Sequence, residues 1–248
     1  MRRRLPSALA ALAAATLATA ALAGAAEDSD IARKVGEQLR RSPIIGQFGL
    51  TAKARDGRVT LDGRVHTLSE SWDAEDLAGK VRGVLEIDNR IALDSRGTSD
   101  AAIEAAVKRR YEDIVAVATA APDVRVDQGT VTLSGKLRDA RTRFTAIDAA
   151  ARIPGVVAVE DRFETPAKDD ETIGKAVAGV LANLSLLHVS GKVRPTVKDG
   201  IVTLTGRVGK LSDRKRVTRL ALGANGVRGV EDRLEIGSSK SDLLIPLE

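Results

Sequence analysis

Few residues of this chain could take part in catalysis. It has no cysteine and only two histidines, His66 and His188, which do not occupy matching positions in the repeats described below. Neither histidine has a second histidine or a pair of carboxylates at metal-ligand spacing, so we interpret each as a solvated loop residue. Motifs for a serine nucleophile, a zinc hydrolase or a phosphate loop are also absent from the sequence. We expect a protein that is not an enzyme, with no catalytic residue, metal or cofactor.

A polar pair near the end of each repeat is a second candidate site. The pairs are Asn89-Arg90, Asp161-Arg162 and Asp232-Arg233. Strand alternation puts the first member of each pair on the core side, where a polar group needs hydrogen-bond partners. Two interpretations are open: an ion or ligand site, or a side chain that holds backbone N–H groups at the sheet rim. The Asn in one copy favours the second interpretation.

Two large aromatic residues are candidate contact residues. Trp72 and Phe144 lie eleven residues before the Gly of a Gly-Val pair, and Lys215 occupies the same place in the last copy. Helical spacing puts this position away from the buried stripe of its own helix, so the ring needs another partner. Three partners are open: a neighbouring unit, the underside of its own sheet if the helix start bends, or a membrane or client surface.

A run of basic residues adds a candidate for anionic partners. It comprises Lys210, Arg214, Lys215, Arg216 and Arg219, on or just before one helix of the last copy. Such a run is usually a solvated helix face. Beside anionic lipid, however, each basic residue contributes about 1 kcal/mol of attraction. The candidate site for a membrane or partner therefore combines this run with the two aromatic residues.

A unit of about seventy residues that occurs three times must position these candidates. Each copy has an apolar stripe at helical spacing, two alternating segments around a Gly-containing turn, a second helical stripe and a last alternating segment. This order predicts an α+β fold of αββαβ units. We expect each unit to have a three-stranded mixed sheet with two helices on one face.

Two local features carry further expectations. An Asp lies three residues before an Ile at the start of each unit, at Asp28, Asp100 and Asp170, where it is expected to cap the first helix. A Gly falls on the inward face of the second strand each time, at Gly63, Gly135 and Gly206. A missing side chain there is expected to let a helix approach the sheet closely.

The motif Asp-Gly-x-Val-Thr-Leu-x-Gly-x-Val and the later Val-x-Asp-Arg-Leu resemble the BON domain, named for bacterial osmotic-stress and nodulation proteins. Gln128 in place of Asp, and Pro195 within a strand, depart from the pattern. The predicted division is a signal peptide at 1–26, BON domains at 27–95, 99–165 and 169–237, and a tail at 238–248. The resemblance implies a binding module of the cell envelope.

The first residues predict export. Arg2, Arg3 and Arg4 precede an Ala-rich apolar run and small residues, as in a cleaved secretory signal. Without cysteine the protein cannot be a lipoprotein, and we expect it to be periplasmic with no transmembrane segment after cleavage. Of the 39 basic residues, 36 then remain against 34 acidic ones. This near balance, with few aromatic residues, argues against nucleic-acid binding.

Two functions follow as hypotheses. In the first, the protein binds anionic phospholipid surfaces and supports envelope integrity under osmotic stress, as the resemblance implies, with the basic run and the aromatic residues as contacts. In the second, it is a periplasmic chaperone or scaffold for unfolded or outer-membrane proteins, and the apolar stretch 243–247 of the tail adds client contacts. The sequence leaves the oligomeric state open.

Overall fold

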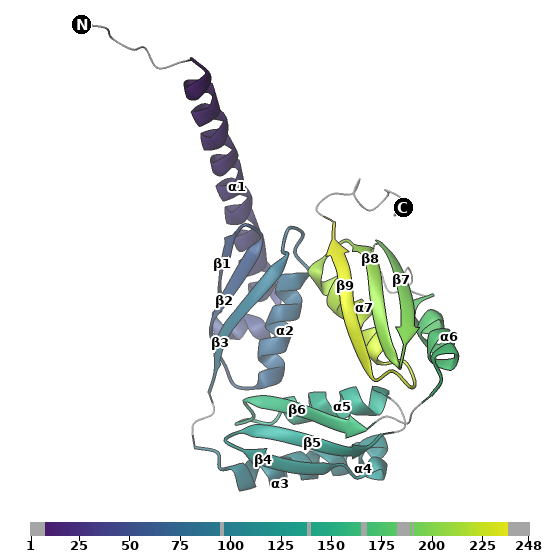
Figure 1. The fold of residues 1–248 in the computed structure, drawn as a ribbon. Helices are drawn as coiled ribbons and strands as arrows, with labels where there is room; N and C mark the ends of the chain where they lie inside the picture. The colour runs from purple at the N-terminus through teal and green to yellow at the C-terminus, as the bar shows by residue number, and fades with distance from the viewer. Residues whose placement is uncertain are drawn as a thin grey trace, which may run out of the picture.

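The structure is a computed structural model that describes residues 8–94, 97–137, 140–164, 168–182, 189 and 191–237. The described residues form three α+β domains in succession, as predicted (Figure 1). The first contains α1 (Ala8–Arg41), η1 (Ile45–Phe48), β1 (Thr51–Arg55), β2 (Arg58–Val65), α2 (Leu68–Gly79) and β3 (Glu86–Leu93). The second contains α3 (Asp100–Glu112), α4 (Val115–Ala120), β4 (Asp123–Asp127), β5 (Thr130–Lys136), α5 (Ala140–Ala151) and β6 (Ala158–Glu164). The third contains α6 (Asp170–Leu181), β7 (Gly191–Lys198), β8 (Ile201–Val208), α7 (Leu211–Leu222) and β9 (Gly229–Ile236).

Each domain has the mixed three-stranded sheet that the sequence predicts. The middle strand of each sheet pairs antiparallel with the strand before it and parallel with the strand after the helix. Alternate residues of these middle strands are buried, as Val59 and Leu61 illustrate with no exposed surface. In each domain the helix before the sheet contacts the helix that follows the middle strand, here called the second helix: α1 contacts α2, α3 contacts α5 and α6 contacts α7. The second domain has an additional short helix, α4, which the sequence did not predict and which packs against both α3 and α5. The buried side of each sheet and its helices therefore enclose one core per domain.

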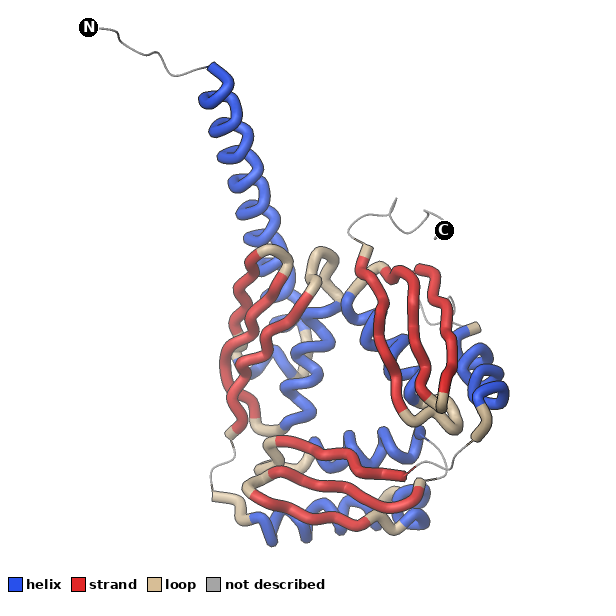
Figure 2. The backbone as a smooth tube through the Cα atoms, viewed as in Figure 1, coloured by secondary structure: helices blue, strands red, loops and turns tan. Residues whose placement is uncertain are grey.

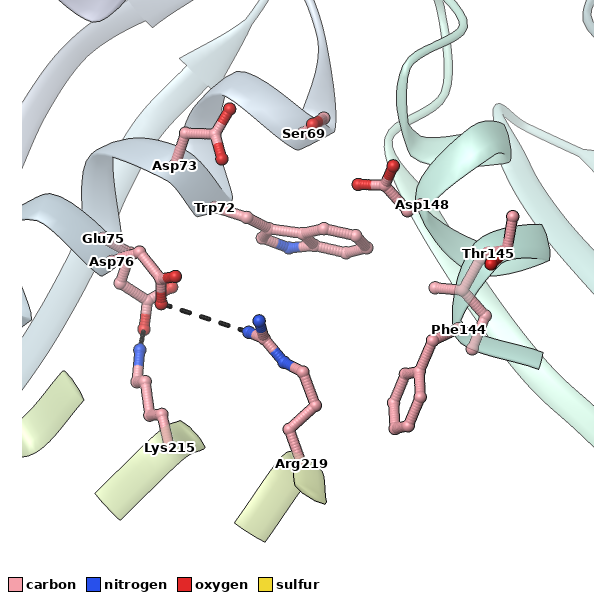
Figure 3. Close-up of a pocket in the computed structure, with 11 residues that line it drawn as sticks. Ser69, Trp72, Asp73, Glu75, Asp76, Phe144, Thr145, Asp148, Lys215 and Arg219 are labelled. Atoms are coloured by element: carbon pink, nitrogen blue, oxygen red, sulfur yellow. Dashed lines mark hydrogen bonds and ion pairs between the residues drawn. The ribbon is translucent and has the colours of Figure 1, made fainter. Parts of the chain in front are cut away.

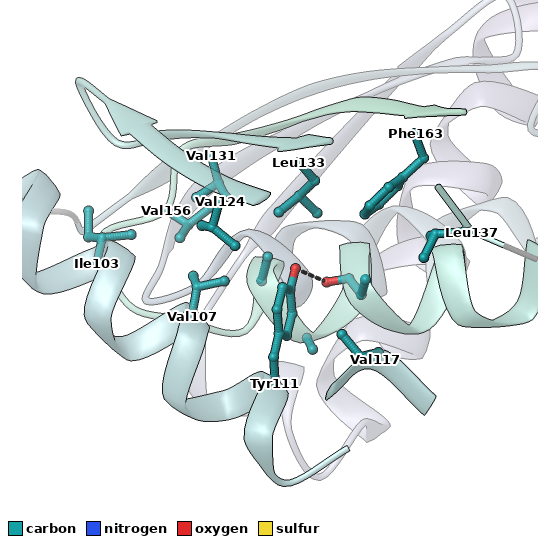
Figure 4. Packing of buried hydrophobic residues seen from close by; sticks show 13 residues of the cluster. Ile103, Val107, Tyr111, Val117, Val124, Val131, Leu133, Leu137, Val156 and Phe163 are labelled. Carbon is teal, nitrogen blue, oxygen red and sulfur yellow. Dashed lines mark hydrogen bonds between the residues drawn. The ribbon is translucent and has the colours of Figure 1, made fainter. Parts of the chain in front are cut away.

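Tyr111 connects α3 and α5 of the second domain. It lies in the apolar cluster that contains Val107, Val131 and Leu133 (Figure 4). Its hydroxyl donates a hydrogen bond of 2.9 Å to the carbonyl oxygen of Ala146 on α5, which satisfies the only polar atom of the side chain. Burial raises the pKa of the Tyr111 hydroxyl above its usual value. The tyrosine is therefore a core residue with its polar group paired.

The Asp at the start of each unit does not have the predicted capping role. Ser99 and Asp169, one residue earlier, cap α3 and α6. Asp28, Asp100 and Asp170 instead lie inside the helices and accept hydrogen bonds of 2.8–3.2 Å from two successive backbone N–H groups of the hairpin turn. The two residues that donate are the central residues of each turn, both with positive φ, and they lie outside the strand pairing, so their N–H groups have no strand partners. The carboxylate joins helix to hairpin, so the prediction of helix caps was wrong.

The expectation for the inward glycines was also wrong. Gly63, Gly135 and Gly206 have φ of +140°, +130° and +121°, a region that residues with a side chain rarely adopt. The nearest atoms to a Cβ built at these positions belong to Leu50, Pro122 and Lys192, in or just before the first strand of each sheet, and not to a helix. Backbone conformation beside the edge strand therefore requires these glycines.

Helix α1 runs without a break through the predicted cleavage region, and its N-terminal part projects away from the domains (Figure 1). Within the described part of the chain, no helix is both long and apolar enough to span a bilayer. Removal of residues 1–26 remains a prediction, and it would leave Asp28 at the start of the helix.

The three domains are arranged in a triangle with α2, α5 and α7 turned towards its centre (Figure 2). Helix α2 contacts both α5 and α7. Apolar side chains cross the boundaries, since Leu211 of the third domain packs into the core cluster of the first, and Leu68 of the first packs against that of the second. The second helix of each domain therefore forms the interface between domains.

Candidate functional site between the domains

A cavity of about 590 Å³ lies where the second helices of the three domains meet. Its lining residues from α2 are Ser69, Trp72, Asp73, Glu75 and Asp76; those from α5 are Phe144, Thr145, Ile147 and Asp148; those from α7 are Lys215 and Arg219. Figure 3 shows Trp72 extending from α2 toward α5, and Glu75 and Asp76 of α2 facing Lys215 and Arg219 of α7. Cavities of this size bind small molecules or a few side chains of a peptide.

The local sequence of α2 fixes how its side chains enter the cavity. Thr67 and Glu70 form a capping box in which each accepts a hydrogen bond from the backbone N–H of the other. The buried stripe that begins with Ala74 then faces the domain's own core. Because Trp72 lies half a turn from this stripe, the indole must point away from its own domain.

Both predicted aromatic residues line this cavity. Trp72 is 37% exposed and extends across it toward Asp148 and Phe144 (Figure 3). The Phe144 ring approaches Gly223 at the end of α7, where an added Cβ would lie 3.5 Å from it. The sequence left three partners open for these rings: a neighbouring unit, the underside of their own sheet, or a membrane or client surface. Because both rings line the cavity between domains, they do not pack under their own sheets. The rings face a space between domains.

The predicted basic residues divide into groups. Lys215 forms an ion pair and hydrogen bond with Glu75 of the first domain, and Arg219 lies 4.0 Å from Asp76. Arg214 instead pairs within its own domain, with Asp232 at 2.9 Å. Lys215, Arg219 and Arg214 therefore already contact carboxylates.

The other two basic residues, Lys210 and Arg216, line a second cavity of about 250 Å³ beside the first. Its remaining lining residues are Asp76, Lys80, Ser212, Asp213 and Arg219. The wall contains four basic and two acidic side chains, so this smaller cavity has an excess of positive charge. It lies between the end of α2 and the start of α7.

Sequence reasoning missed the acidic residues that surround Trp72. Asp73 is half-buried, and its pKa is raised first by burial and further by the nearby carboxylates of Asp148, Asp76 and Glu70, although Arg152 opposes the shift. One feature of the sequence could have predicted them. Helix α2 has a run of acidic residues, and the equivalent helix of the third domain, α7, has the run of basic residues. Opposite charges on equivalent helices favour a contact between them, and the structure shows that contact between α2 and α7.

The polar pairs near the end of each domain have the structural role that the sequence favoured. Asn89, Asp161 and Asp232 each accept a hydrogen bond of 3.0–3.1 Å from the backbone N–H two residues later. Each also contacts the second helix of its domain, through Ser71 in the first domain and Arg143 and Arg214 in the others. The neutral Ser–Asn pair thus replaces an Arg–Asp pair. These side chains fasten the last strand to the second helix.

The structure places His66 on the surface, with its ring 5.2 Å from that of Phe48 in an edge-on contact. His188 lies outside the described residues. Across the residues that can be described, no group of three or more potential metal ligands comes together.

A family model for the BON domain matches residues 27–95, 99–167 and 169–238. Because these matches cover most of the chain, the protein belongs to the BON domain family, with three tandem copies.

Among individual proteins, the chain is similar to osmotically-inducible protein Y of Escherichia coli strain K12. The two are 25% identical over 207 residues, which cover 80% of this chain and 97% of that protein. A search of solved structures matched CdsD, a structural protein of the type III secretion system of Chlamydia trachomatis, at 14% identity and a TM-score of 0.24, covering 86% of this chain and 94% of that one. The C-terminal domain of CdsD matched at 15% identity and a TM-score of 0.23, covering 84% and 97%.

Proposed function

We propose that this protein is a non-enzymatic, exported chaperone or scaffold that holds unfolded or outer-membrane polypeptides. The convergence of Trp72 and Phe144, from different domains, on one open cavity supports this function most directly. Aromatic rings contribute large apolar contact area at low entropic cost, which suits the binding of varied side chains.

Suppression of aggregation tests this proposal. We expect the chain without residues 1–26 to slow the aggregation of reduced insulin, and Trp72→Ala/Phe144→Ala to lose at least about three-quarters of that effect, because two buried aromatic contacts of about 1–2 kcal/mol each disappear. Light scattering provides the measurement.

The matched control is Ile44→Ala/Val115→Ala. It removes two apolar side chains that are 55% and 82% exposed and do not line the cavity. Equal loss of suppression in both double variants would mean that general surface hydrophobicity, and not the cavity, holds the client. Full suppression by Trp72→Ala/Phe144→Ala would overturn the proposal.

A second candidate function is attachment to anionic phospholipid surfaces, with a role in envelope integrity under osmotic stress. The basic cavity formed by Lys80, Lys210, Arg216 and Arg219 favours it, because phosphate groups bind where basic side chains converge. Lys215 contributes less to this surface, since it contacts Glu75.

Co-sedimentation with vesicles tests this second function. We expect binding to phosphatidylglycerol-containing vesicles at low salt, no binding to neutral vesicles, and at least tenfold weaker binding by Lys210→Glu/Arg216→Glu, because each basic residue contributes about 1 kcal/mol near an anionic surface. Lys53→Glu, on the outer face of the first sheet, is the control. Absence of binding to anionic vesicles at low salt would exclude the lipid function.

A further inference from the structure

One side of the central cavity already accepts basic side chains. On α2, Glu75 pairs with Lys215 and Asp76 lies 4.0 Å from Arg219, both from the third domain. The acidic face of α2 is therefore a surface on which cationic side chains from another part of the protein dock (Figure 3). Lys215 and Glu75 are the more buried pair, with side chains 31% and 25% exposed, whereas Arg219 and Asp76 are 60% and 42% exposed. Solvent therefore screens the first pair less than the second.

Asp73 extends this acidic face but differs from its neighbours. In the part of the chain that the structure describes, no basic side chain comes within ion-pair distance of Asp73. Arg152 is the basic group that lowers the pKa of Asp73, against the effect of burial, but its own ion pair, of 2.8 Å, is with Asp148. Asp73 is thus a half-buried carboxylate in the wall of the cavity. The cation that most affects it, Arg152, is paired with Asp148.

The charge balance of the cavity is negative. Four carboxylates line it, from Asp73, Glu75, Asp76 and Asp148, against the two basic side chains Lys215 and Arg219. Including Arg152 beside Asp148 still leaves one negative charge in excess. The face of an indole attracts cations through its quadrupole, and Trp72 adjoins Asp73 in the sequence and lies across the cavity. The cavity therefore complements a positive charge next to an apolar group.

We propose that the cavity binds polypeptide segments in which a lysine or arginine lies beside a large apolar side chain, with the cation at Asp73 and Trp72 and the apolar group against Phe144 and Ile147. This inference rests on the proposed chaperone or scaffold function and names its preferred clients. Within the protein, Lys215 and Arg219 already contact two other carboxylates of α2, those of Glu75 and Asp76. A client lysine would form an ion pair with Asp73, the carboxylate of this acidic face that has no ion pair among the described residues.

Three labelled ten-residue peptides test the inference. All have the same leucines and alanines, with lysine, glutamine or glutamate at the remaining positions, and fluorescence anisotropy reports their binding to the mature chain. We expect the lysine peptide to bind about tenfold more tightly than the glutamine peptide, and the glutamate peptide to bind most weakly. Asp73→Asn should weaken the lysine peptide about fivefold and leave the glutamine peptide unchanged. Asp123→Asn, at an exposed position outside the cavity, is the control.

Thermal melting separates binding from folding. The raised pKa of Asp73 means that its charged form is disfavoured in the folded protein, so the Asp73→Asn variant should melt no lower than wild type at neutral pH. The difference should vanish as the pH falls below the pKa of Asp73, because the carboxyl is then neutral. A lower melting temperature for Asp73→Asn would assign this residue a structural role and overturn the inference.

The outcomes distinguish the inference from the function on which it rests. Equal affinity for the three peptides, with suppression of insulin aggregation intact, overturns the charge preference and leaves the chaperone or scaffold function standing. Failure to bind any peptide together with failure to suppress aggregation overturns both. Binding to anionic vesicles in that last case favours the lipid function.

Discussion

Gly206→Ala lowers the free energy of unfolding of the third domain by more than about 3 kcal/mol. Gly206 has a φ of +121°, and a Cβ at this position would overlap the carbonyl oxygen of Lys192 on β7. Backbone strain alone costs about 1–3 kcal/mol, and the overlap forces the edge strand away from its partner in addition. Differential scanning calorimetry of the mature chain measures the loss as a lower melting temperature for one transition.

Gly135→Ala is the matched control for that prediction. Gly135 occupies the same position in the second domain, with a φ of +130°, but its added Cβ would meet only the Cα of Pro122 at an ordinary 3.7 Å. We therefore expect a smaller loss, of about 1–2 kcal/mol, from strain alone. If the two variants lose equal stability, the overlap with β7 contributes nothing and the prediction for Gly206 fails.

Lys215→Glu/Arg219→Glu separates the third domain from the first. The change places two new carboxylates opposite Glu75 and Asp76, so attraction becomes repulsion across the contact between α2 and α7. Loss of a half-buried pair and gain of repulsion together cost about 2 kcal/mol or more, which multiplies the open population by about thirty. Small-angle scattering of the mature chain should show a larger radius of gyration.

Charge exchange provides the control for this second prediction. Adding Glu75→Lys/Asp76→Arg to the charge-reversed protein restores opposite charges in exchanged positions, and we expect most of the compact form to return. Peptide binding should fall and recover in parallel, because Trp72 and Phe144 line one cavity only while the domains are in contact. An unchanged radius of gyration in the charge-reversed protein would show that the apolar contact of Leu211 with the core of the first domain suffices to hold the two domains together.

The prediction of the fold from sequence succeeded because its signals are local. The alternation of Val59 and Leu61, the helical stripe of α2 and the Gly in each hairpin turn each involve residues close in the chain. Three copies of the same pattern removed the ambiguity that a single short repeat would leave. The BON resemblance drew on those same residues, and the family match agrees with it.

The sequence could not supply partners that are distant along the chain. The carboxylate of Asp100 had two plausible sets of N–H groups, those of its own helix and those of a turn 28 residues away, and packing selected the turn. In the same way, strand alternation predicted that Gly206 faces inward, but it could not predict that the neighbouring segment is β7 and not a helix. For the aspartates and for the glycines, the sequence therefore predicted the right helix or strand but the wrong neighbouring segment.

The sequence by itself determined the repeating unit, the order of its elements and the residues of its cores, because hydrophobic periodicity and turn glycines are properties of neighbouring residues. Only the tertiary structure decided that the outward faces of α2, α5 and α7 meet around a cavity. The pair of Lys215 and Glu75 joins residues 140 positions apart, and such a contact depends on how whole domains pack. The sequence predicted Trp72, Phe144 and the basic run as candidate contact residues, whereas domain packing determined which acidic side chains lie around them.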